Sequence, residues 1–445
     1  MPFRHVEEHT GSRSFLHAKP DCASADRTNP SGHDTAQFPY RTSMPAEPFA
    51  PPPEVAETIL EHVTPWPQFS AWAIRVDKST GTEHAGLHAA ICNCLRLHAE
   101  AGEGIWFHWK DWLYACILPT TTPSAESAQR FQADLAEQRA ETVSIGVTHF
   151  PLLEFDPAQT LLNSWKALNH AAFFGSGCIV AFDAVSLNIS ADNHYQVGRV
   201  AEAVTEYRLA LDLDPTNVNV LNSLGVCLAE TGDRVNAAEV FQQVLAIDPN
   251  EAMALYNLGI LRLMDGDEQQ ALSLFQQAYA TDSEWFEIPL QIGKLLTERK
   301  AYADAIPLLE AAIALRGDFS PVHSMLGRCL ACTGKSQEAI AAYKRAVKIN
   351  PNDAAALSAL GALYDARNEN RDVCFTFCRQ SVALDPNNGL YRLRLARLYH
   401  KHDRLNQALA EYRRATELGC DASPQISKIT SQLASHDDKT KCCTG

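Results

Sequence analysis

A fixed spacing of thirty-four residues runs through the C-terminal half of this chain. An alanine and a glycine each recur at that interval, and a large residue follows each alanine by four positions. The positions are Ala203, Ala237, Ala271, Ala305 and Ala339; Gly225, Gly259, Gly293, Gly327 and Gly361; and Tyr207, Phe241, Phe275, Leu309, Tyr343 and Phe377. The pattern places a one-residue insertion after Phe377 and resumes at Pro386. A constant period of this length indicates stacked structural repeats, because one unit cannot bury its own apolar face.

Each unit reads as two helices joined by a short turn, as in "AETGDRVNAA". The recurring glycine and alanine allow the two backbones to approach closely, and the large residue fills the space between neighbouring units. We therefore predict an all-α solenoid over residues 184–422 with seven units. They start near Ala184, Val218, Ala252, Phe286, Ser320, Ala354 and Gly389.

This pattern resembles the tetratricopeptide repeat (TPR) family across about 240 residues. The resemblance implies a right-handed superhelix whose concave groove, lined by the first helix of each pair, binds a partner protein or peptide. In the family, groove residues occupy positions two, five, nine and twelve of a unit. The partner-binding candidates that follow are Asn222, Met253, Tyr256, Ile260, Lys294, Arg328 and Arg397.

The third unit has apolar residues at these groove positions, namely Met253, Tyr256 and Ile260. Flanked by the cations of later units, such a face suits a peptide with an apolar anchor and an acidic end. In the alternative interpretation, the same three side chains pack across a tightly wound groove or against the N-terminal domain. The sequence leaves both interpretations open.

The part of the chain before the repeats mixes helix and strand signals. Residues 1–50 are rich in proline and polar residues, so we predict that they are disordered. Residues 54–183 give the order α-β-α-β-β-α-β-α-β, which predicts one sheet covered by helices. The strand pair comes from "GIWFHW" and "WLYACILP", separated by "KD", a pattern typical of a hairpin.

The segment Phe69–Asp183 resembles the diguanylate cyclase (GGDEF) domain. The family has a strand like "TVSIGV", a helix with an ALYxAK pattern, and a glycine-containing turn into a last strand. This chain has "TVSIGV" at Thr142–Val147, "ALNHAA" at Ala167–Ala172, and "GSG" before "CIVAF". The resemblance implies a nucleotide-cyclase-like α/β fold, and the domain pairing resembles bacterial proteins.

The chemistry of that family is missing from this sequence. Cyclisation needs Mg²⁺ held by carboxylates beside the nucleotide phosphates. The signature turn falls on Lys110, Asp111, Trp112 and Leu113, and a family metal-binding aspartate falls on Arg75. We therefore interpret Arg75, Asp77 and the turn residues as a vestigial site and predict no catalysis.

Two other hypotheses concern this domain. It could sense a guanine nucleotide or cyclic di-GMP and so control partner binding by the repeats. Alternatively, Asp77 and Asp111 could form a rebuilt metal pair, although two isolated carboxylates are weak evidence for one. We favour a non-enzymatic scaffold in which the α/β domain serves as a docking module.

Composition limits the remaining possibilities. A formal net charge of −15 argues against a phosphate-neutralising surface, so we predict no nucleic-acid partner. Among the thirteen cysteines, Cys329 and Cys332 form one CxxC, but no second cysteine pair or histidine pair lies at zinc-site spacing, so we predict no metal and no cofactor. With no apolar run long enough to span a membrane, we expect a cytoplasmic protein. Residues 423–445 are predicted to be a partly disordered tail.

Overall fold

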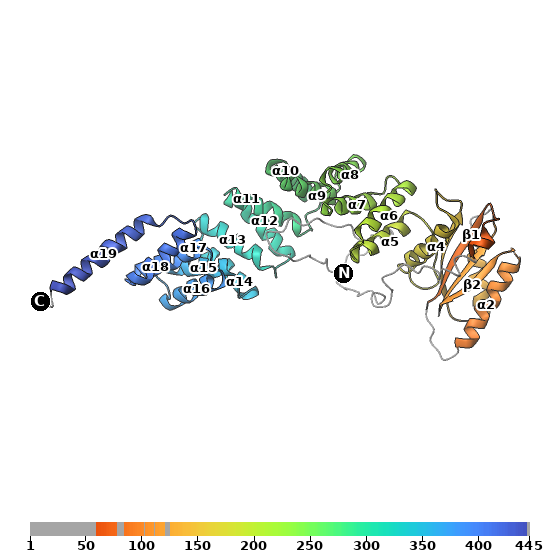
Figure 1. Ribbon diagram of the computed structural model, residues 1–445, viewed down its shortest axis with the longest axis horizontal. Coiled ribbons are helices and arrows are strands. Elements are labelled where there is room, and N and C mark those ends of the chain that lie inside the picture. Colours follow the sequence, from red (N-terminus) through yellow and green to blue (C-terminus); the bar gives the residue numbers. More distant parts are fainter. Residues whose placement is uncertain (1–58, 78–83, 102, 111, 121–124, 443–445) are drawn as a thin grey trace. The chain divides into compact units, whose positions relative to one another are not determined.

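The computed structural model describes residues 59–77, 84–101, 103–110, 112–120 and 125–442 (Figure 1). The chain forms two compact units, Met1–Asp265 and Gly266–Gly445. A five-stranded sheet and the first repeat helices belong to the first unit, and further repeat helices form the second. The N-terminal disorder predicted for residues 1–50 lies outside the described residues, as do residues 443–445 of the tail.

The sheet is mixed and has the strand order β2-β3-β1-β4-β5. Its pairs are antiparallel except for β4 and β5, which run parallel. A parallel pair needs a crossover connection, and helix α4 supplies it. The strands are β1 (Phe69–Val76), β2 (Ile105–Lys110), β3 (Leu113–Leu118), β4 (Val143–Phe150) and β5 (Ile179–Ala181).

Both faces of this sheet are covered by helices. Trp72 and Ile74 of β1 are buried on the face that α2 and α3 cover, together with Phe131. Alternate residues of a strand point to opposite faces, so Ala71 and Ala73 pack on the other side, with a helical turn over residues 59–63 and with α4. The covering helices are α2 (His84–Ala101), α3 (Ala125–Ala136) and α4 (Pro157–Ala171).

Helix α4 approaches β4 unusually closely at Gly146. A Cβ added there would lie 2.1 Å from the Ser164 carbonyl oxygen and 2.2 Å from the Leu168 amide nitrogen. The start of α4 is fixed by a capping box, in which the Asp156 carboxylate accepts from the Gln159 amide at 2.7 Å and the Gln159 side chain accepts in return at 3.0 Å. A glycine in "TVSIGV" therefore serves helix–sheet packing.

The repeat helices follow β5 almost immediately, because the Asp183 side chain caps α5 two residues after the strand ends. In the first unit each helix packs against the next one along the chain from α5 to α9. These helices are α5 (Ala184–Gln196), α6 (Val200–Leu213), α7 (Val218–Glu230), α8 (Arg234–Ile247) and α9 (Ala252–Met264).

The second unit continues the series of paired helices and ends with a longer one, α19. Here too each helix packs against its successor from α10 to α19. The helices are α10 (Glu268–Thr281), α11 (Glu287–Glu298), α12 (Tyr302–Leu315), α13 (Ser320–Cys332), α14 (Ser336–Ile349), α15 (Ala354–Ala366), α16 (Arg371–Leu384), α17 (Gly389–Lys401), α18 (Leu405–Glu417) and α19 (Ser423–Cys442).

The small and large positions of the period meet in the pairs α7–α8, α11–α12 and α13–α14. A Cβ at Gly225 would lie 2.6 Å from the Phe241 ring, and one at Gly327 would lie 2.9 Å from the Tyr343 ring. The recurring alanine beside them, such as Ala237, is fully buried. The recurring glycine and alanine therefore mark the places where paired helices pack closely, as expected from their small side chains.

The sixth pair corrects the expected position of the insertion. The side chain facing Gly361 is Cys378, whose sulfur would lie 2.5 Å from an added Cβ, and not Phe377. Phe377 stacks on Tyr364 with ring centres 6.3 Å apart. The extra residue therefore lies before α16, in its turn from α15, where Asn370 adopts a left-handed φ of 49°. A turn absorbs an extra residue more easily than a packed helix does.

Candidate partner-binding surface

The groove candidates of the first unit are not on the surface. Met253 is 5% exposed, and Asn222, Tyr256 and Ile260 are 0% exposed. They lie on α7 and α9, whose residues are buried almost continuously along both helices. An apolar face open to solvent is therefore not found at these residues, and the alternative interpretation, in which they are packed, describes their environment.

The candidates of the second unit are more accessible. Lys294 on α11 is half-buried, whereas Arg328 on α13 and Arg397 on α17 are exposed. Helix α13 has an exposed edge at Pro321, Arg328 and Cys332, as the helical period requires for one open stripe. Neither arginine forms an ion pair within the described ranges. The second unit therefore presents cations at predicted groove positions.

Acidic and hydroxyl groups beside this stripe are engaged in holding helices together. The Asp353 carboxylate accepts from the Ser320 hydroxyl at 3.0 Å and from the Ser324 hydroxyl at 2.6 Å. It also caps α15 by accepting from the Ala356 amide at 2.9 Å. Asp353 thus joins α13 to the start of α15.

Sequence reasoning missed one further cation, Arg394 on α17. Its guanidinium donates to the Ser358 hydroxyl at 3.0 Å. Burial lowers the pKa of Arg394, and the neighbouring charge of Arg397 lowers it further. Position six of a unit is not a family groove position, so only the observation that arginines recur in "RLRLAR" could have drawn attention to it.

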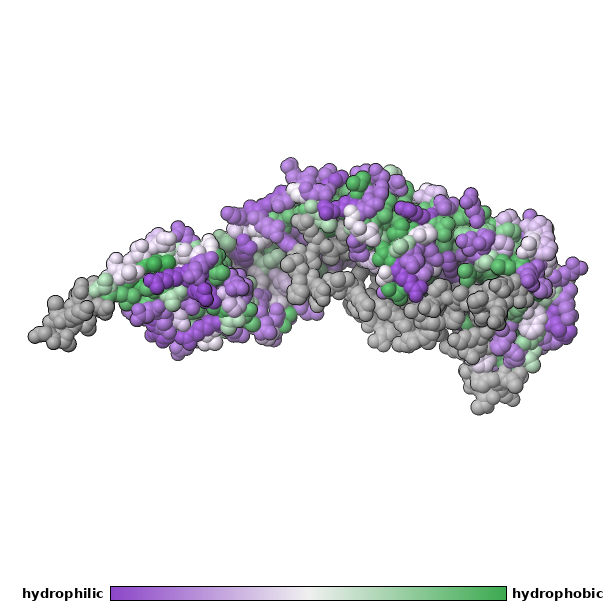
Figure 2. Space-filling model, viewed as in Figure 1, coloured by the Kyte–Doolittle hydropathy of each residue, from purple (hydrophilic) through white to green (hydrophobic). Residues whose placement is uncertain are grey.

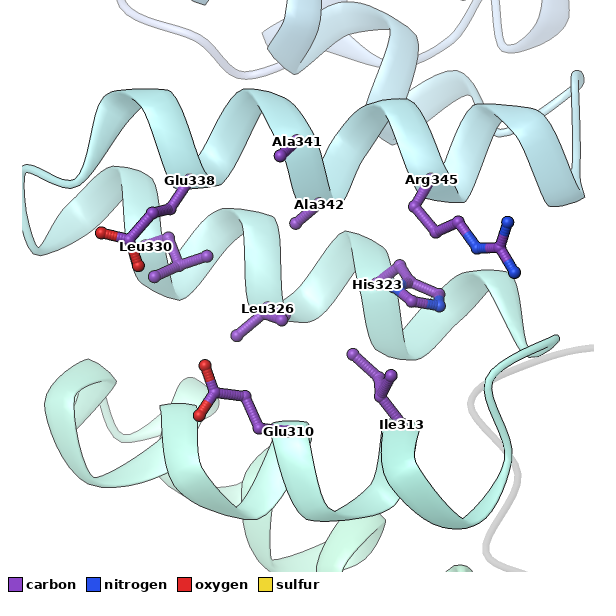
Figure 3. Close-up of a pocket in the computed structure, with 9 residues that line it drawn as sticks. All are labelled: Glu310, Ile313, His323, Leu326, Leu330, Glu338, Ala341, Ala342 and Arg345. Atoms are coloured by element: carbon purple, nitrogen blue, oxygen red, sulfur yellow. The ribbon is translucent and has the colours of Figure 1, made fainter.

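An open groove lies elsewhere in the second unit, between α12, α13 and α14 (Figure 3). Its volume is about 370 Å³, and Leu326, Leu330 and Ala342 form an apolar floor. In Figure 3, the Glu310 and Glu338 carboxylates lie beside the two leucines. Arg345 and His323 lie at the other end of the groove. Polar residues predominate on the visible faces of the C-terminal helices, with smaller apolar patches between them (Figure 2). The residues lining the groove are Glu310, Ile313, His323, Leu326, Leu330, Glu338, Ala341, Ala342 and Arg345.

The vestigial-site candidates gather at one end of the sheet. Arg75 pairs with Leu113 across β1 and β3, and Lys110 pairs with the same leucine across the hairpin. The Trp112 carbonyl accepts from the Val76 amide at 3.1 Å. Asp111 lies outside the described residues. This edge is therefore built from backbone pairing around Leu113.

Asp77 has a structural function at the neighbouring strand ends. Its carboxylate accepts from the Thr142 hydroxyl at 2.9 Å, from the Gly177 amide at 2.7 Å, and from the Ser144 hydroxyl. These contacts join the end of β1 to the start of β4 and to the turn before β5. In the described part of the chain, no three His, Cys, Asp or Glu side chains are placed to hold a metal ion.

A cluster of rings that the sequence did not predict lies between α2 and the hairpin. His88 Nδ1 is 2.9 Å from the Tyr114 hydroxyl, and the His88 and His108 ring centres are 4.6 Å apart. Burial raises the pKa of Tyr114 to about 12, so its phenol stays protonated at neutral pH. The contacts pack α2 onto the strands. His88 and Tyr114 are 26 residues apart in the sequence, so no local pattern indicates that they meet.

Three models of the tetratricopeptide repeat family match this chain, at residues 190–252, 240–273 and 296–363. Together with the paired helices, these matches support TPR repeats within residues 190–273 and 296–363. A comparison with curated proteins found no match.

Several solved structures are similar to part of this chain. YrrB, described as a TPR protein with an unusual peptide-binding site, is 19% identical over 42% of this chain and 95% of its own, with a TM-score of 0.39. Pseudomonas aeruginosa pilF is 19% identical over 48% and 97%, with a TM-score of 0.41. A TPR protein from Parabacteroides merdae is 14% identical over 56% and 98%, with a TM-score of 0.37.

Among the helices that the structure describes, none combines the length and apolar character required to cross a membrane.

Proposed function

We propose that this protein is a non-enzymatic scaffold that holds a partner protein or peptide on its TPR helices. The observation that carries the proposal is the pair of exposed arginines, Arg328 and Arg397, at groove positions of the second unit. TPR units mediate protein–protein interaction, and exposed guanidiniums are the groups best suited to grip a carboxylate through two parallel hydrogen bonds.

The ligand that fits this surface is a peptide segment with an acidic end. Arg328 and Arg397 would hold its carboxylates, while Lys294 adds positive charge on α11. The apolar side chains Met253, Tyr256 and Ile260 are buried, so the proposal no longer uses them as direct contacts.

We propose that the N-terminal α/β unit serves as a docking module. We infer that it is a degenerate GGDEF-like domain, because its strand, helix and turn order follows the family pattern after β3. The residues that the family's signature requires are absent: Trp112 lies in the turn and Leu113 begins β3, Arg75 stands at the metal position, and the Asp77 carboxylate accepts protein hydrogen bonds. No cyclase product should form from GTP and Mg²⁺.

A peptide-display selection on the full-length protein tests the binding proposal. Selected peptides should be enriched in Asp and Glu at one end, and Arg328→Glu should weaken their binding at least about tenfold, the loss of one charge-assisted contact. Lys348→Glu is the matched control, since Lys348 is an exposed cation on α14 away from the predicted groove positions. Equal losses in both variants would show non-specific electrostatics and contradict the proposal.

A calorimetric titration with GTP, GDP and cyclic di-GMP, with and without Mg²⁺, tests the assignment of the N-terminal unit. We expect no saturable heat from the folded protein. Saturable binding of any of the three nucleotides would replace the docking assignment by a sensor.

A further inference from the structure

Three arginines surround one aromatic ring in the second unit. The guanidinium carbons of Arg404, Arg379 and Arg371 lie 4.8, 5.4 and 5.9 Å from the centre of the Phe375 ring. All three arginines are exposed, and Phe375 beneath them is 5% exposed. We call Arg371, Arg379 and Arg404 with this ring the Phe375 arginine cluster.

The cluster has hydrogen-bond donors without acceptors. Arg379 Nε donates to the Tyr399 hydroxyl at 3.1 Å. The two amino groups of the Arg379 guanidinium remain as further donors. Within the described residues, none of the three arginines is within ion-pair distance of a carboxylate. Each guanidinium carries five N–H donors and no acceptor, so an anion bound at the cluster would accept hydrogen bonds from several of them.

Two of the three arginines lie at helix N-termini. Arg371 is the first residue of α16, and Arg404 is the N-cap of α18. Neither helix start has a side-chain cap, and α6, α12 and α14 also begin without one. A cation at a helix N-terminus is electrostatically unfavourable, because the helix dipole favours negative charge there.

Carboxylates near the cluster are either paired with other cations or outside ion-pair distance of its guanidiniums, within the described residues. Asp365 is 2.8 Å from Lys401 and 4.0 Å from His402, whose ring also lies against Phe375 at 5.5 Å. Glu369 is 2.6 Å from Arg367. Asp372 and Asp403 are exposed, and neither is within ion-pair distance of a guanidinium in the described part of the chain.

We propose that the Phe375 arginine cluster binds a dianionic phosphoryl group. Three guanidiniums lie around one ring, and a single carboxylate would carry too little charge to match them. A phosphoryl group carries a charge of roughly −1.5 to −2 and three acceptor oxygens. Cation–π contact with Phe375 holds the arginines in place before the anion arrives. The proposal is independent of the groove and of its peptide.

The test compares two sources of the same chemistry on the full-length protein. The probes are inorganic phosphate, and a short Gly/Ser peptide containing one phosphoserine, with its unphosphorylated form as control. Melting temperature and calorimetric binding are measured at constant ionic strength, with chloride replaced by the probe. Phosphate should raise the melting temperature in a saturable way. A phosphopeptide bound more tightly than phosphate identifies a phosphorylated partner, and equal affinities identify a free anion.

Variants distinguish phosphate binding by the arginines from a purely structural role in which they only cover Phe375. Arg404→Gln should weaken phosphate binding by about tenfold, whereas the matched surface change Arg413→Gln on α18 should leave it unchanged. Asp403→Asn removes a neighbouring negative charge and should tighten binding. If phosphate does not bind the folded wild-type protein, or binds Arg404→Gln equally well, the arginines serve only to cover Phe375 and the proposal is overturned.

Discussion

Replacing Gly146 by alanine tests the helix–sheet packing of the N-terminal unit. The added methyl carbon would lie 2.1 Å from the Ser164 carbonyl oxygen, where ordinary contact begins near 3.4 Å. It would also lie 2.2 Å from the Leu168 amide nitrogen. Both obstacles are helix backbone, so no side-chain rotation relieves the overlap. Helix α4 must move away from β4 by about 1 Å.

The cost of that movement follows from what α4 buries. Trp165 and Leu168 are 5% and 2% exposed against the sheet. A gap of 0.5–1 Å forfeits roughly a quarter to a half of a dispersion contact. Overpacking of a core costs about 1–3 kcal/mol, and a backbone obstacle places this change at the upper end, so we expect about 3 kcal/mol of lost stability.

Denaturant unfolding followed by tryptophan fluorescence measures this loss. Six of the seven tryptophans precede residue 190, so the signal reports mainly on the N-terminal unit. The matched control is Gly86→Ala, at an exposed position of α2. There the nearest atom to an added Cβ is 3.6 Å away. There alanine should stabilise by about 0.5–1 kcal/mol. A Gly146→Ala protein with an unchanged unfolding midpoint would refute the close approach.

Three further predictions concern other parts of the chain. Ala237→Leu should destabilise by about 1–3 kcal/mol in thermal unfolding, because Ala237 is fully buried; an unchanged melting temperature would contradict the repeat register. Asp77→Ala should lower the unfolding midpoint equally with and without Mg²⁺, since Asp77 accepts protein hydrogen bonds; Mg²⁺ stabilisation of the wild type alone would instead indicate a metal site. Although burial opposes it, hydrogen bonding from His170 and Ser186 holds the pKa of Asp183 below its ordinary 3.8. The stability from Asp183 is therefore present above pH 3.8 and is lost as pH falls through the lower folded pKa; Asp183→Asn should flatten that acid limb in pH-dependent denaturation.

The helical repeats were predictable because their signal is periodic and redundant. Gly225, Gly293 and Gly327 all face a large residue sixteen positions later, so one contact is encoded many times. The small mixed sheet was also predictable, from runs such as "WLYACILP" that become β3. The insertion in the sixth pair was misplaced because Phe377 and Cys378 are neighbours, and only packing shows which one faces Gly361.

The candidate site was harder to predict from sequence. Position in a unit identified Arg328 and Arg397, but it could not show that Tyr256 and Ile260 are buried, because burial depends on contacts from elsewhere in the chain. The Phe375 arginine cluster joins Arg371, Arg379 and Arg404 from two successive helix pairs. Nothing in the local sequence brings these residues to one ring.

The most direct test of the scaffold account is the affinity of a selected acidic-ended peptide for the wild-type protein and for Arg328→Glu, Arg397→Glu and Lys348→Glu. The account predicts that both groove variants lose at least about tenfold in affinity while keeping the wild-type melting temperature, and that Lys348→Glu retains full binding. Undiminished binding by the Arg328→Glu and Arg397→Glu proteins would show that the partner does not use this surface of the TPR helices.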